Sequence, residues 1–487
     1  MSTTKNNHDN DTGDDDQATS ENSMKQSSAI TTTPNNEDTF VIVAGDVGGT
    51  NSRLALYTSN GERLYHRDYR NEEYLLKDDD DDVDTTPSDR MFEQKILIPF
   101  LQCCCSEGRS STYDWNVFEI VVVCLAVAGP VKDNTVQTSR HKALEINGYD
   151  LLQRCQNSGD PFIRKVVQCY IINDFVAQGY GCLTLQKDDV VEIDVVSGSN
   201  NQNNQQTKNN PNNNNKKKNG PIVCIGAGTG FGTCYLTTTT GPAALSSDKN
   251  STATTTTTTT TTTRTSSSYY TCLPSEFGQI EWTPRTEQEI DLWRYLKQKL
   301  DSPNRVSLEE VVSGTGLAYC YDGYAALYPQ KVTPSIHEQC NTAGDMKGKV
   351  VADHADDCEV CHMAMTTVMR SYGAAASTCA MTFLPTGGLY ISGGLAPKHL
   401  SSWIQGSDSC FLTAYRDKGR ASSILNDIPL FVVTCDDLGL RGAYQYALQQ
   451  ISIKQQQNDT FQENESMDKD GRVQGRTVVG WEECVET

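Results

Sequence analysis

The sequence predicts an α/β protein with two domains and a cleft between them. Two observations carry this prediction. Short buried strands end in polar or glycine-rich segments, and a strand–glycine loop–strand unit occurs twice, in separate parts of the 487 residues. Once the polar low-complexity segments are set aside, roughly 350 residues remain, which is enough for two domains of ordinary size.

Four polar segments are predicted to lie outside the folded core, as disordered tails and low-complexity insertions. Such segments bury too little apolar surface to offset the entropy of ordering them. Insertions of this kind are tolerated in surface loops because closure entropy grows slowly with loop length. The predicted limits are a tail at 1–38, a small α/β domain at 39–183, an insertion at 184–219, a large α/β domain at 220–436 with a Thr-rich insertion at 249–268, a C-terminal helix at 437–452 that returns to the core, and a tail at 453–487.

The net charge, the cysteine content and the absence of long apolar stretches limit the partners and the cellular location that we expect. The formal net charge of −21 argues against a nucleic-acid partner, because phosphate backbones need a basic face. The 18 cysteines follow no framework spacing, which is typical of a reduced protein. No apolar stretch approaches the roughly 18–20 residues of a membrane span, and no signal-peptide pattern is present, so we expect no membrane partner and a cytoplasmic enzyme.

The first half of the chain predicts strands whose ends carry polar groups. Residues 39–44 form a short β-branched run, and the strand that they predict ends at the segment GDVGGTN. A second strand at 52–57 follows, so the pair is predicted to be a hairpin. Strands at 119–127 and 166–172 come next, and the second of these ends at Asn173 and Asp174. Open α/β sheets bind their ligands at such strand ends.

The second half repeats this arrangement and adds helices. A strand at 221–225 leads into the loop GAGTGFG, and a strand at 233–236 leaves it. Hydrophobic periodicity and buried runs predict the remaining elements. They are helices at 287–300 and 354–383, strands at 389–391 and 428–434, and a last helix at 441–450.

The two glycine loops are candidate phosphate cradles. Glycine lets several backbone N–H groups approach one phosphate without a Cβ clash. Neither loop is a Walker P-loop, since lysine is absent and a strand follows instead of a helix. Two such loops suit one triphosphate held from two domains. Asp46, at the mouth of the first loop, could hold Mg²⁺ through water or could only cap the turn. The candidate residues are Gly48, Gly49, Thr50 and Asn51 in one loop and Gly226, Gly228, Thr229, Gly230 and Gly232 in the other.

Carboxylates and amides elsewhere suit the recognition of a sugar and the activation of its hydroxyl. Phosphoryl transfer needs positioning, charge neutralisation and a base for the nucleophile's proton. Asp174 at the end of a buried strand is the candidate base. The segments 273–279 and 308–316 contain Glu276 and Glu309, whose carboxylates could accept hydrogen bonds from sugar hydroxyls.

The chain resembles the glucokinase family of bacterial and protist type, in the actin–hexokinase–Hsp70 ATPase-domain superfamily. The motifs that carry the resemblance occur in the family's order and span the predicted folded part. They are GDVGGTNSRLALY at 45–57, IINDF at 171–175, GAGTGFG at 226–232, LPSEFG at 273–278, EEVVSGTGL at 309–317, YISGGLAPK at 390–398, DKGR at 417–420 and DIPLFVV at 427–433.

The resemblance implies a fold, a reaction and a set of site residues. The fold is the two-domain actin/hexokinase-like (ribonuclease H-like) one, and the reaction is the phosphorylation of D-glucose by ATP with Mg²⁺, the first step of glycolysis. A homodimer is also implied. Asp174 matches the family's catalytic base, the glycine loops match its phosphate loops, and Gly393 and Gly394 match its adenosine-side turn. The matching substrate ligands are Asn173, Glu276 and Glu309, with Gln279 beside them.

Two departures from the family leave the sugar open. Gln279 stands where the family usually has histidine, and Ser139 and Lys142 replace an asparagine and an apolar anchor. Gln279 can still bond a hydroxyl but cannot titrate. The alternatives are a kinase for another hexose and a glucose-binding sensor with impaired catalysis. A nucleotide-driven switch is a further rival, but it would have no hydroxyl ring for the two Glu motifs to recognise.

A CxxCH motif at 358–362, with His354 four residues before it, matches a haem-attachment pattern and could suggest zinc. Haem attachment requires an exported chain, and a single CxxC leaves zinc short of ligands. We interpret the segment as a helix face with reduced thiols.

Overall fold

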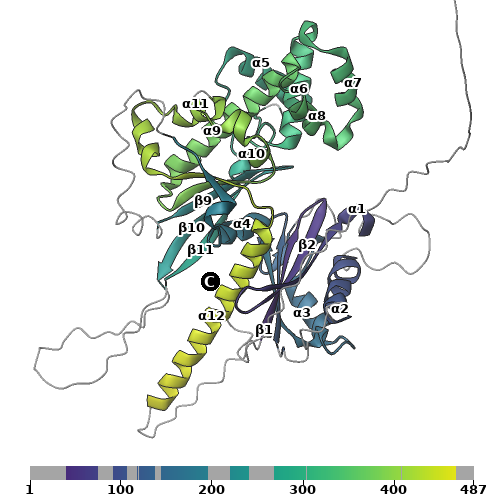
Figure 1. The fold of residues 1–487 in the computed structure, drawn as a ribbon, viewed down its shortest axis with the longest axis vertical. Helices are drawn as coiled ribbons and strands as arrows, with labels where there is room; N and C mark the ends of the chain where they lie inside the picture. Colours follow the sequence, from purple (N-terminus) through teal and green to yellow (C-terminus); the bar gives the residue numbers. More distant parts are fainter. Residues whose placement is uncertain are drawn as a thin grey trace, which may run out of the picture.

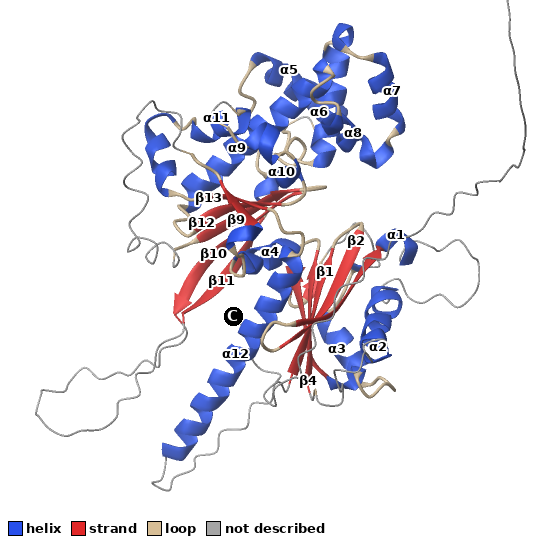
Figure 2. Ribbon diagram, viewed as in Figure 1, coloured by secondary structure: helices blue, strands red, loops and turns tan. Residues whose placement is uncertain are grey.

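Two large sheets with helices on their faces, together with a small two-stranded sheet, make up the part of the chain that the structure describes (Figures 1 and 2). The computed structural model describes residues 40–74, 91–106, 118, 120–137, 144–195, 220–240, 268–302, 304–406 and 409–467. The predicted tail at 1–38, Ser139, Lys142 and most of both predicted insertions lie outside the described residues.

The smaller sheet has the strand order β3-β2-β1-β4-β7. Strands β1 and β2 form the predicted antiparallel hairpin, while β4 and β7 add in parallel. Alternate residues of β1 face opposite sides: Val41 and Val43 pack toward α2 and α3, whereas Ile42 and Ala44 pack toward α12. The elements of this part are β1 Phe40–Val47, β2 Asn51–Thr58, β3 Arg63–Arg70, α1 Asn71–Tyr74, η2 Glu93–Leu97, α2 Ile98–Ser106, β4 Ile120–Val127, β5 Val131–Lys132, β6 Thr135–Val136, α3 Gly148–Gln156, η4 Ile163–Lys165 and β7 Val166–Asn173.

The larger sheet has the order β11-β10-β9-β12-β13-β8. Its β9 and β10 form the second predicted hairpin, and β9, β12 and β13 are parallel. Helices α5 to α11 lie on the face of this sheet away from the smaller one (Figure 2). The elements are η5 Lys187–Asp189, β8 Val190–Glu192, β9 Ile222–Ala227, β10 Phe231–Thr240, β11 Ser268–Ser275, η6 Phe277–Gln279, α5 Glu287–Lys299, α6 Gly314–Leu327, η7 Pro329–Lys331, α7 Pro334–Thr342, η8 Gly344–Met346, α8 Lys347–Asp353, α9 Glu359–Phe383, β12 Gly388–Ser392, α10 Leu395–Lys398, η9 Leu400–Ile404, α11 Cys410–Arg416, η10 Gly419–Asp427 and β13 Leu430–Val433.

Helix α4, Asp174–Cys182, lies between the two sheets and packs on both, with α12, Leu438–Met467, beside it (Figure 1). Glycines make this contact possible. A Cβ at Gly179 would lie 2.6 Å from the sulfurs of Cys234 and Cys272 in the larger sheet. A Cβ at Gly442 of α12 would overlap the carbonyl oxygen of Ala177. Helix α4 is therefore in close contact with both halves of the molecule.

Three predicted boundaries differ from the structure. The insertion placed at 184–219 contains η5 and the edge strand β8, whose two valines are too short an apolar run to detect. The last helix continues to Met467 instead of ending at 452, because the Gln-rich segment that we assigned to a tail is compatible with a helix. The helix placed at 354–383 begins at Glu359, and α8 precedes it as a separate helix.

Within the described residues, no helix combines the length and the apolar character needed to span a membrane.

Replacing Gly442 with alanine tests the packing of α4 against α12. The added methyl would overlap the Ala177 carbonyl, so we expect the free energy of unfolding to fall by about 1–3 kcal/mol, the usual range for overpacking. Denaturant unfolding measures this change. The matched control is Gly159→Ala, where no atom lies within 4 Å of the added Cβ. Equal stability of the two variants would contradict the close contact.

Candidate active site

Asp174 begins α4 immediately after strand β7. Asn173 caps this helix: its Oδ1 accepts hydrogen bonds from the N–H groups of Phe175 and Val176 at 2.9 and 3.2 Å. The Asn173 amide donates to the Gly129 carbonyl and to Asp174 Oδ1, both at 2.9 Å. The Phe175 N–H also donates to Asp174 Oδ1 at 2.9 Å. The cap thus holds the Asp174 carboxyl in one orientation at the strand end.

The Asp174 carboxyl carries a strongly shifted pKa. Burial, with the negative charge of Asp46 as the second cause, raises the pKa of Asp174 from 3.8 to about 7, although hydrogen bonds from Phe175 and Asn173 oppose the shift. Burial also raises the pKa of Asp46, opposed by Arg53 directly across the hairpin. Two carboxyl groups thus interact unfavourably at the ends of β1 and β7. A base with a pKa near neutrality is well matched to proton abstraction at physiological pH.

The first glycine loop is the turn between β1 and β2. The Gly48 N–H donates to the Asn51 carbonyl at 2.9 Å, which closes the turn. The buried side chain of Asn71 donates to the carbonyls of Gly48 and Gly49 at 2.7 and 3.2 Å. Asp46 lies two residues before this loop. A Cβ at Gly439, in the first turn of α12, would lie 2.7 Å from Asp46 Oδ2, so this helix begins directly against the carboxylate.

The second glycine loop is the turn between β9 and β10, and α4 contacts it. The Gly228 N–H donates to the Gly230 carbonyl, and the Gly314 N–H at the start of α6 donates to the Gly228 carbonyl, both at 2.8 Å. The ring of Phe175, next to the candidate base, fills the space beside the loop. A Cβ at Gly232 would overlap this ring, and one at Gly226 would lie 3.0 Å from its Cζ. The base and the second loop are therefore joined by one side chain.

Glu309 lies against the second loop, at a position that its motif alone did not predict. Its Oε2 accepts a hydrogen bond from the Phe231 N–H at 2.9 Å, and a Cβ at Gly230 would lie 2.6 Å from the same oxygen. The Gln279 amide donates to Glu309 Oε1 at 3.5 Å. The structure thus brings Glu309 and Gln279 together. Glu276 is the N-cap residue of η6 nearby, but its exposed side chain accepts no capping hydrogen bond.

The predicted adenosine-side turn follows β12 and touches the second loop. Gly393 adopts φ +79°, which favours glycine, and a Cβ there would lie 2.6 Å from the Ala227 carbonyl oxygen. Just before it, the Ser392 hydroxyl donates to Gln178 Oε1 of α4 at 2.6 Å. The turn therefore contacts both the loop and the helix that begins with Asp174. Gly394 is the N-cap residue of α10, and a Cβ there would lie in ordinary contact, 3.8 Å, with Lys398 Nζ.

Sequence reasoning missed three contributors to this site. Asn71 follows a polar edge strand and belongs to no recognised motif, so no sequence pattern indicated a role for it. The role of Phe175 in filling the second loop could have been suspected from its place beside Asp174, since a loop with four glycines leaves room for a neighbouring ring. The Gln178–Ser392 hydrogen bond joins residues 214 apart and carried no sequence signal.

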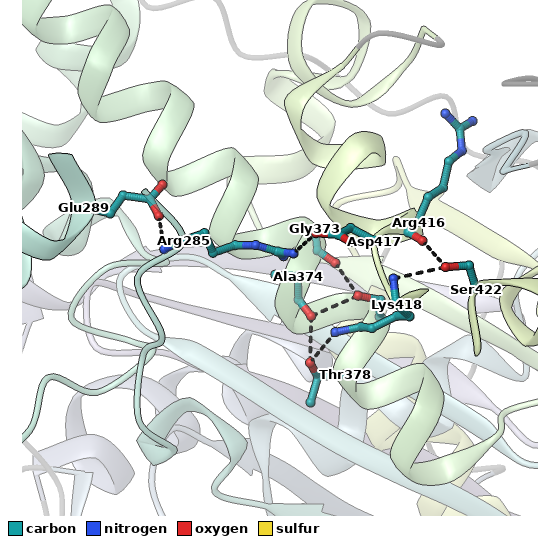
Figure 3. A network of polar contacts seen from close by, with 10 residues as sticks. Arg285, Glu289, Gly373, Ala374, Thr378, Arg416, Asp417, Lys418 and Ser422 are labelled. Atoms are coloured by element: carbon teal, nitrogen blue, oxygen red, sulfur yellow. Dashed lines mark hydrogen bonds and ion pairs between the residues drawn. The ribbon is translucent and has the colours of Figure 1, made fainter. Parts of the chain in front are cut away.

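Two recognised motifs lie outside this site. The DKGR segment at 417–420 joins α11 to α9 and to the start of α5 (Figure 3). Arg285 forms an ion pair with Asp417, and Lys418 Nζ donates to Thr378 Oγ1 at 3.1 Å. In the CxxCH segment, Cys358 and Cys361 are buried and His362 Nδ1 lies 3.1 Å from the Ala355 carbonyl. Among the described residues, no group of three or more His, Cys, Asp or Glu is arranged to hold a metal ion.

Two cavities are also separate from the site. One of about 340 Å³ is lined by β2, β3 and the start of α12, where Arg63 and Arg441 form ion pairs with Asp437. The other, of about 270 Å³, lies around Trp282 and Trp293. No predicted site residue lines either cavity. The candidate site is therefore defined by the hydrogen bonds and charges of its residues.

A sequence model of the glucokinase family matches residues 43–249 and 255–450. The chain belongs to the glucokinase family. It is 28% identical over 420 residues to the glucokinase of Synechocystis sp., covering 82% of this chain and 96% of that protein. It is 29% identical over 416 residues to the glucokinase of Nostoc sp., covering 83% and 97%. The predicted enzyme class, a glucose kinase, is confirmed.

Solved glucokinases share the fold. The glucokinase from an Antarctic psychrotroph aligns with a TM-score of 0.50 at 23% identity and covers 84% of this chain and 98% of its own. The glucokinase from Balamuthia mandrillaris in complex with glucose aligns with a TM-score of 0.51 at 18% identity and covers 84% and 93%. The predicted two-domain actin/hexokinase-like fold of the glucokinase family is confirmed.

The pKa of Asp174 predicts the pH dependence of the reaction. Only the ionised carboxylate accepts a proton, so kcat/KM should be constant well above pH 7 and fall about tenfold per pH unit below it. Steady-state assays from about pH 5.5 to 8.5 measure this profile, with circular dichroism at each pH to confirm that the protein stays folded. An activity that is constant down to about pH 5.5 would contradict the raised pKa.

Proposed function

We propose that this chain transfers the γ-phosphoryl group of ATP to the primary hydroxyl of D-glucose, giving glucose 6-phosphate and ADP, with Asp174 as the general base. The observation that carries the proposal is the position of Asp174. Its carboxyl has a pKa near 7, interacts with Asp46 beside the first glycine loop, and adjoins Phe175, which fills the second loop. The candidate base would thus act next to both candidate phosphate cradles.

Each predicted residue then has a distinct task. The first loop, Gly48 to Asn51, and the second loop, Gly226 to Gly232, would bind the phosphates through backbone N–H groups. Gly393 and Gly394 would border the adenosine. The carboxylate of Glu309 and the amide of Gln279, which meet at 3.5 Å, would orient the sugar hydroxyls together with Asn173 and Glu276.

Asp46 would hold Mg²⁺ through water. The residues present fit a cation: burial raises the pKa of Asp46, and its negative charge helps to raise the pKa of Asp174, so this region holds carboxyl groups in need of positive charge. Oxygen ligands with retained water are what Mg²⁺ prefers beside phosphates. When bound, the metal ion would neutralise charge on the transferred phosphoryl group.

The identity of the sugar depends on the residues around Glu309. Gln279 is exposed and donates to Glu309, so it can present its amide oxygen or nitrogen to a hydroxyl but cannot change charge. A different hexose therefore remains the second candidate substrate. A glucose sensor without turnover is less well supported, because the cap that orients Asp174 is complete.

The experiment that tests the substrate is ATP consumption with Mg²⁺ across glucose, mannose, fructose, galactose and N-acetylglucosamine. We expect the highest kcat/KM with glucose. A higher value with another hexose would keep the reaction class but replace the substrate, and Gln279→His would be the first variant to examine. Glucose binding without ATP consumption would overturn the proposal and favour the sensor.

Replacing Asp174 with alanine tests the base. We expect kcat to fall by about 10²–10⁴, the usual contribution of general base catalysis, while glucose binding by calorimetry persists. The matched control is Asp150→Ala. Asp150 is also in the first turn of a helix capped by asparagine, but it is exposed on α3, so its loss should leave kcat near the wild-type value. Comparable turnover in the two variants would remove the base assignment.

A further inference from the structure

We propose that Asn71 is a positioning residue that fixes the first glycine loop with its N–H groups directed at the nucleotide phosphates, and so determines the affinity for ATP. The inference rests on the proposed function, because it takes the phosphate chain of ATP as the ligand of that loop. Asn71 touches no expected substrate atom. It acts through the backbone of the loop.

One residue forms hydrogen bonds with three consecutive carbonyls of the loop. Asn71 Nδ2 donates to the carbonyl oxygens of Gly48 and Gly49 at 2.7 and 3.2 Å. Its backbone N–H donates to the Thr50 carbonyl at 2.9 Å. The side chain is itself held in place, because Asn71 Oδ1 accepts a hydrogen bond from the Ser52 hydroxyl at 2.7 Å. Asn71 is 2% exposed and Ser52 is fully buried.

The orientation of these carbonyls determines where the loop N–H groups point. A trans peptide is planar, with its C=O and N–H on opposite sides. Because the carbonyls of Gly48, Gly49 and Thr50 face Asn71, the N–H groups of the residues that follow them face away from it. These are the N–H groups of Gly49, Thr50 and Asn51, all three of which are exposed residues. Successive N–H groups on one side of a turn form an anion-binding concavity.

Only an amide side chain satisfies these contacts together. It donates two hydrogen bonds from one end and accepts one at the other. An aspartate of the same shape could still accept from Ser52, but it would place a negative oxygen against the carbonyls of Gly48 and Gly49. The loop would then turn its carbonyls away from Asn71 and lose the orientation of its N–H groups. The predicted defect is therefore in nucleotide binding and leaves the sugar side unchanged.

The variant Asn71→Asp tests the proposal, with Asn134→Asp as its matched control. Asn134 also donates from its amide to a backbone carbonyl, that of Cys169 at 3.0 Å, and accepts from the Ile171 N–H at 2.7 Å, but it contacts β7 instead of the loop. We expect KM for ATP to rise about tenfold or more in Asn71→Asp, with KM for glucose within about twofold of wild type. Asn134→Asp should leave KM for ATP within about twofold, whatever its effect on thermal stability.

A folded Asn71→Asp variant with unchanged KM for ATP overturns the proposal, as does an equal rise in both KM values. Should Asn71→Asp fail to fold, Ser52→Ala decides: the loss of one hydrogen bond to Asn71 should raise KM for ATP about two- to threefold, and no change overturns the proposal. Calorimetric binding of ADP to the same variants gives the test without turnover. If the wild type phosphorylated no hexose, the proposed function would fail while the ADP measurement still tested Asn71.

Discussion

The close packing of helix α4 between the two sheets is the constraint on which the site depends. Gly179 of this helix packs against two cysteine sulfurs of the larger sheet. The carbonyl oxygen of Ala177, in the same helix, packs against Gly442 of α12. Side chains larger than glycine at these positions would push α4 out of its place. Asp174 begins the same helix, and Phe175 and Gln178 extend from it to the second glycine loop and to Ser392. The position of Asp174 is therefore set by close packing against cysteine sulfurs on one side and against backbone on the other, which tolerates little adjustment.

This packing also explains the charge properties of the site. Because α4 is enclosed, the Asp174 carboxyl loses hydration, and the neighbouring Asp46 adds repulsion. The cap by Asn173 and the Phe175 N–H keep the shift from becoming larger by bonding to the ionised form. The pKa near 7 results from these opposed effects. An exposed aspartate at the same point of the sequence would titrate near its ordinary value and would be a weaker base.

Much of the fold was predictable from the sequence because its central strands are continuous β-branched runs. Residues 40–44 and 120–127 contain no charged or amide side chain, and both lie in central strands of the smaller sheet. The edge elements were not predictable in this way. Strand β3 has several charged residues and only one buried side chain, that of Tyr69, and β8 has three residues, so neither has a hydrophobic run of its own. Their conformation comes from pairing with a neighbouring strand, which single-sequence patterns do not report.

The residues of the candidate site were likewise predictable only where their role depends on neighbours in the sequence. Residues whose role depends on local backbone, such as the glycine loops and the Asn173–Asp174 cap, were identified because their neighbours in sequence are also their neighbours in space. Glu309 was identified as a carboxylate, but its contact with Phe231 and Gly230 across 78 and 79 positions could not be foreseen. Asn71 was missed because its function lies in the carbonyls of residues about 20 positions earlier.

The two glycine loops are held in place by different interactions. The first loop is held from behind by one buried amide, Asn71, which bonds to its carbonyls. The second loop is held by an aromatic ring, a carboxylate and the N-terminal residue of α6, which occupy the space on its sides. The first loop is thus supported by hydrogen bonds, whereas the second combines hydrogen bonds, to Glu309 and from Gly314, with steric support from the Phe175 ring. Should both loops bind the phosphates as proposed, the buried amide behind the first loop and the Phe175 ring beside the second would hold the two cradles in place next to Asp174.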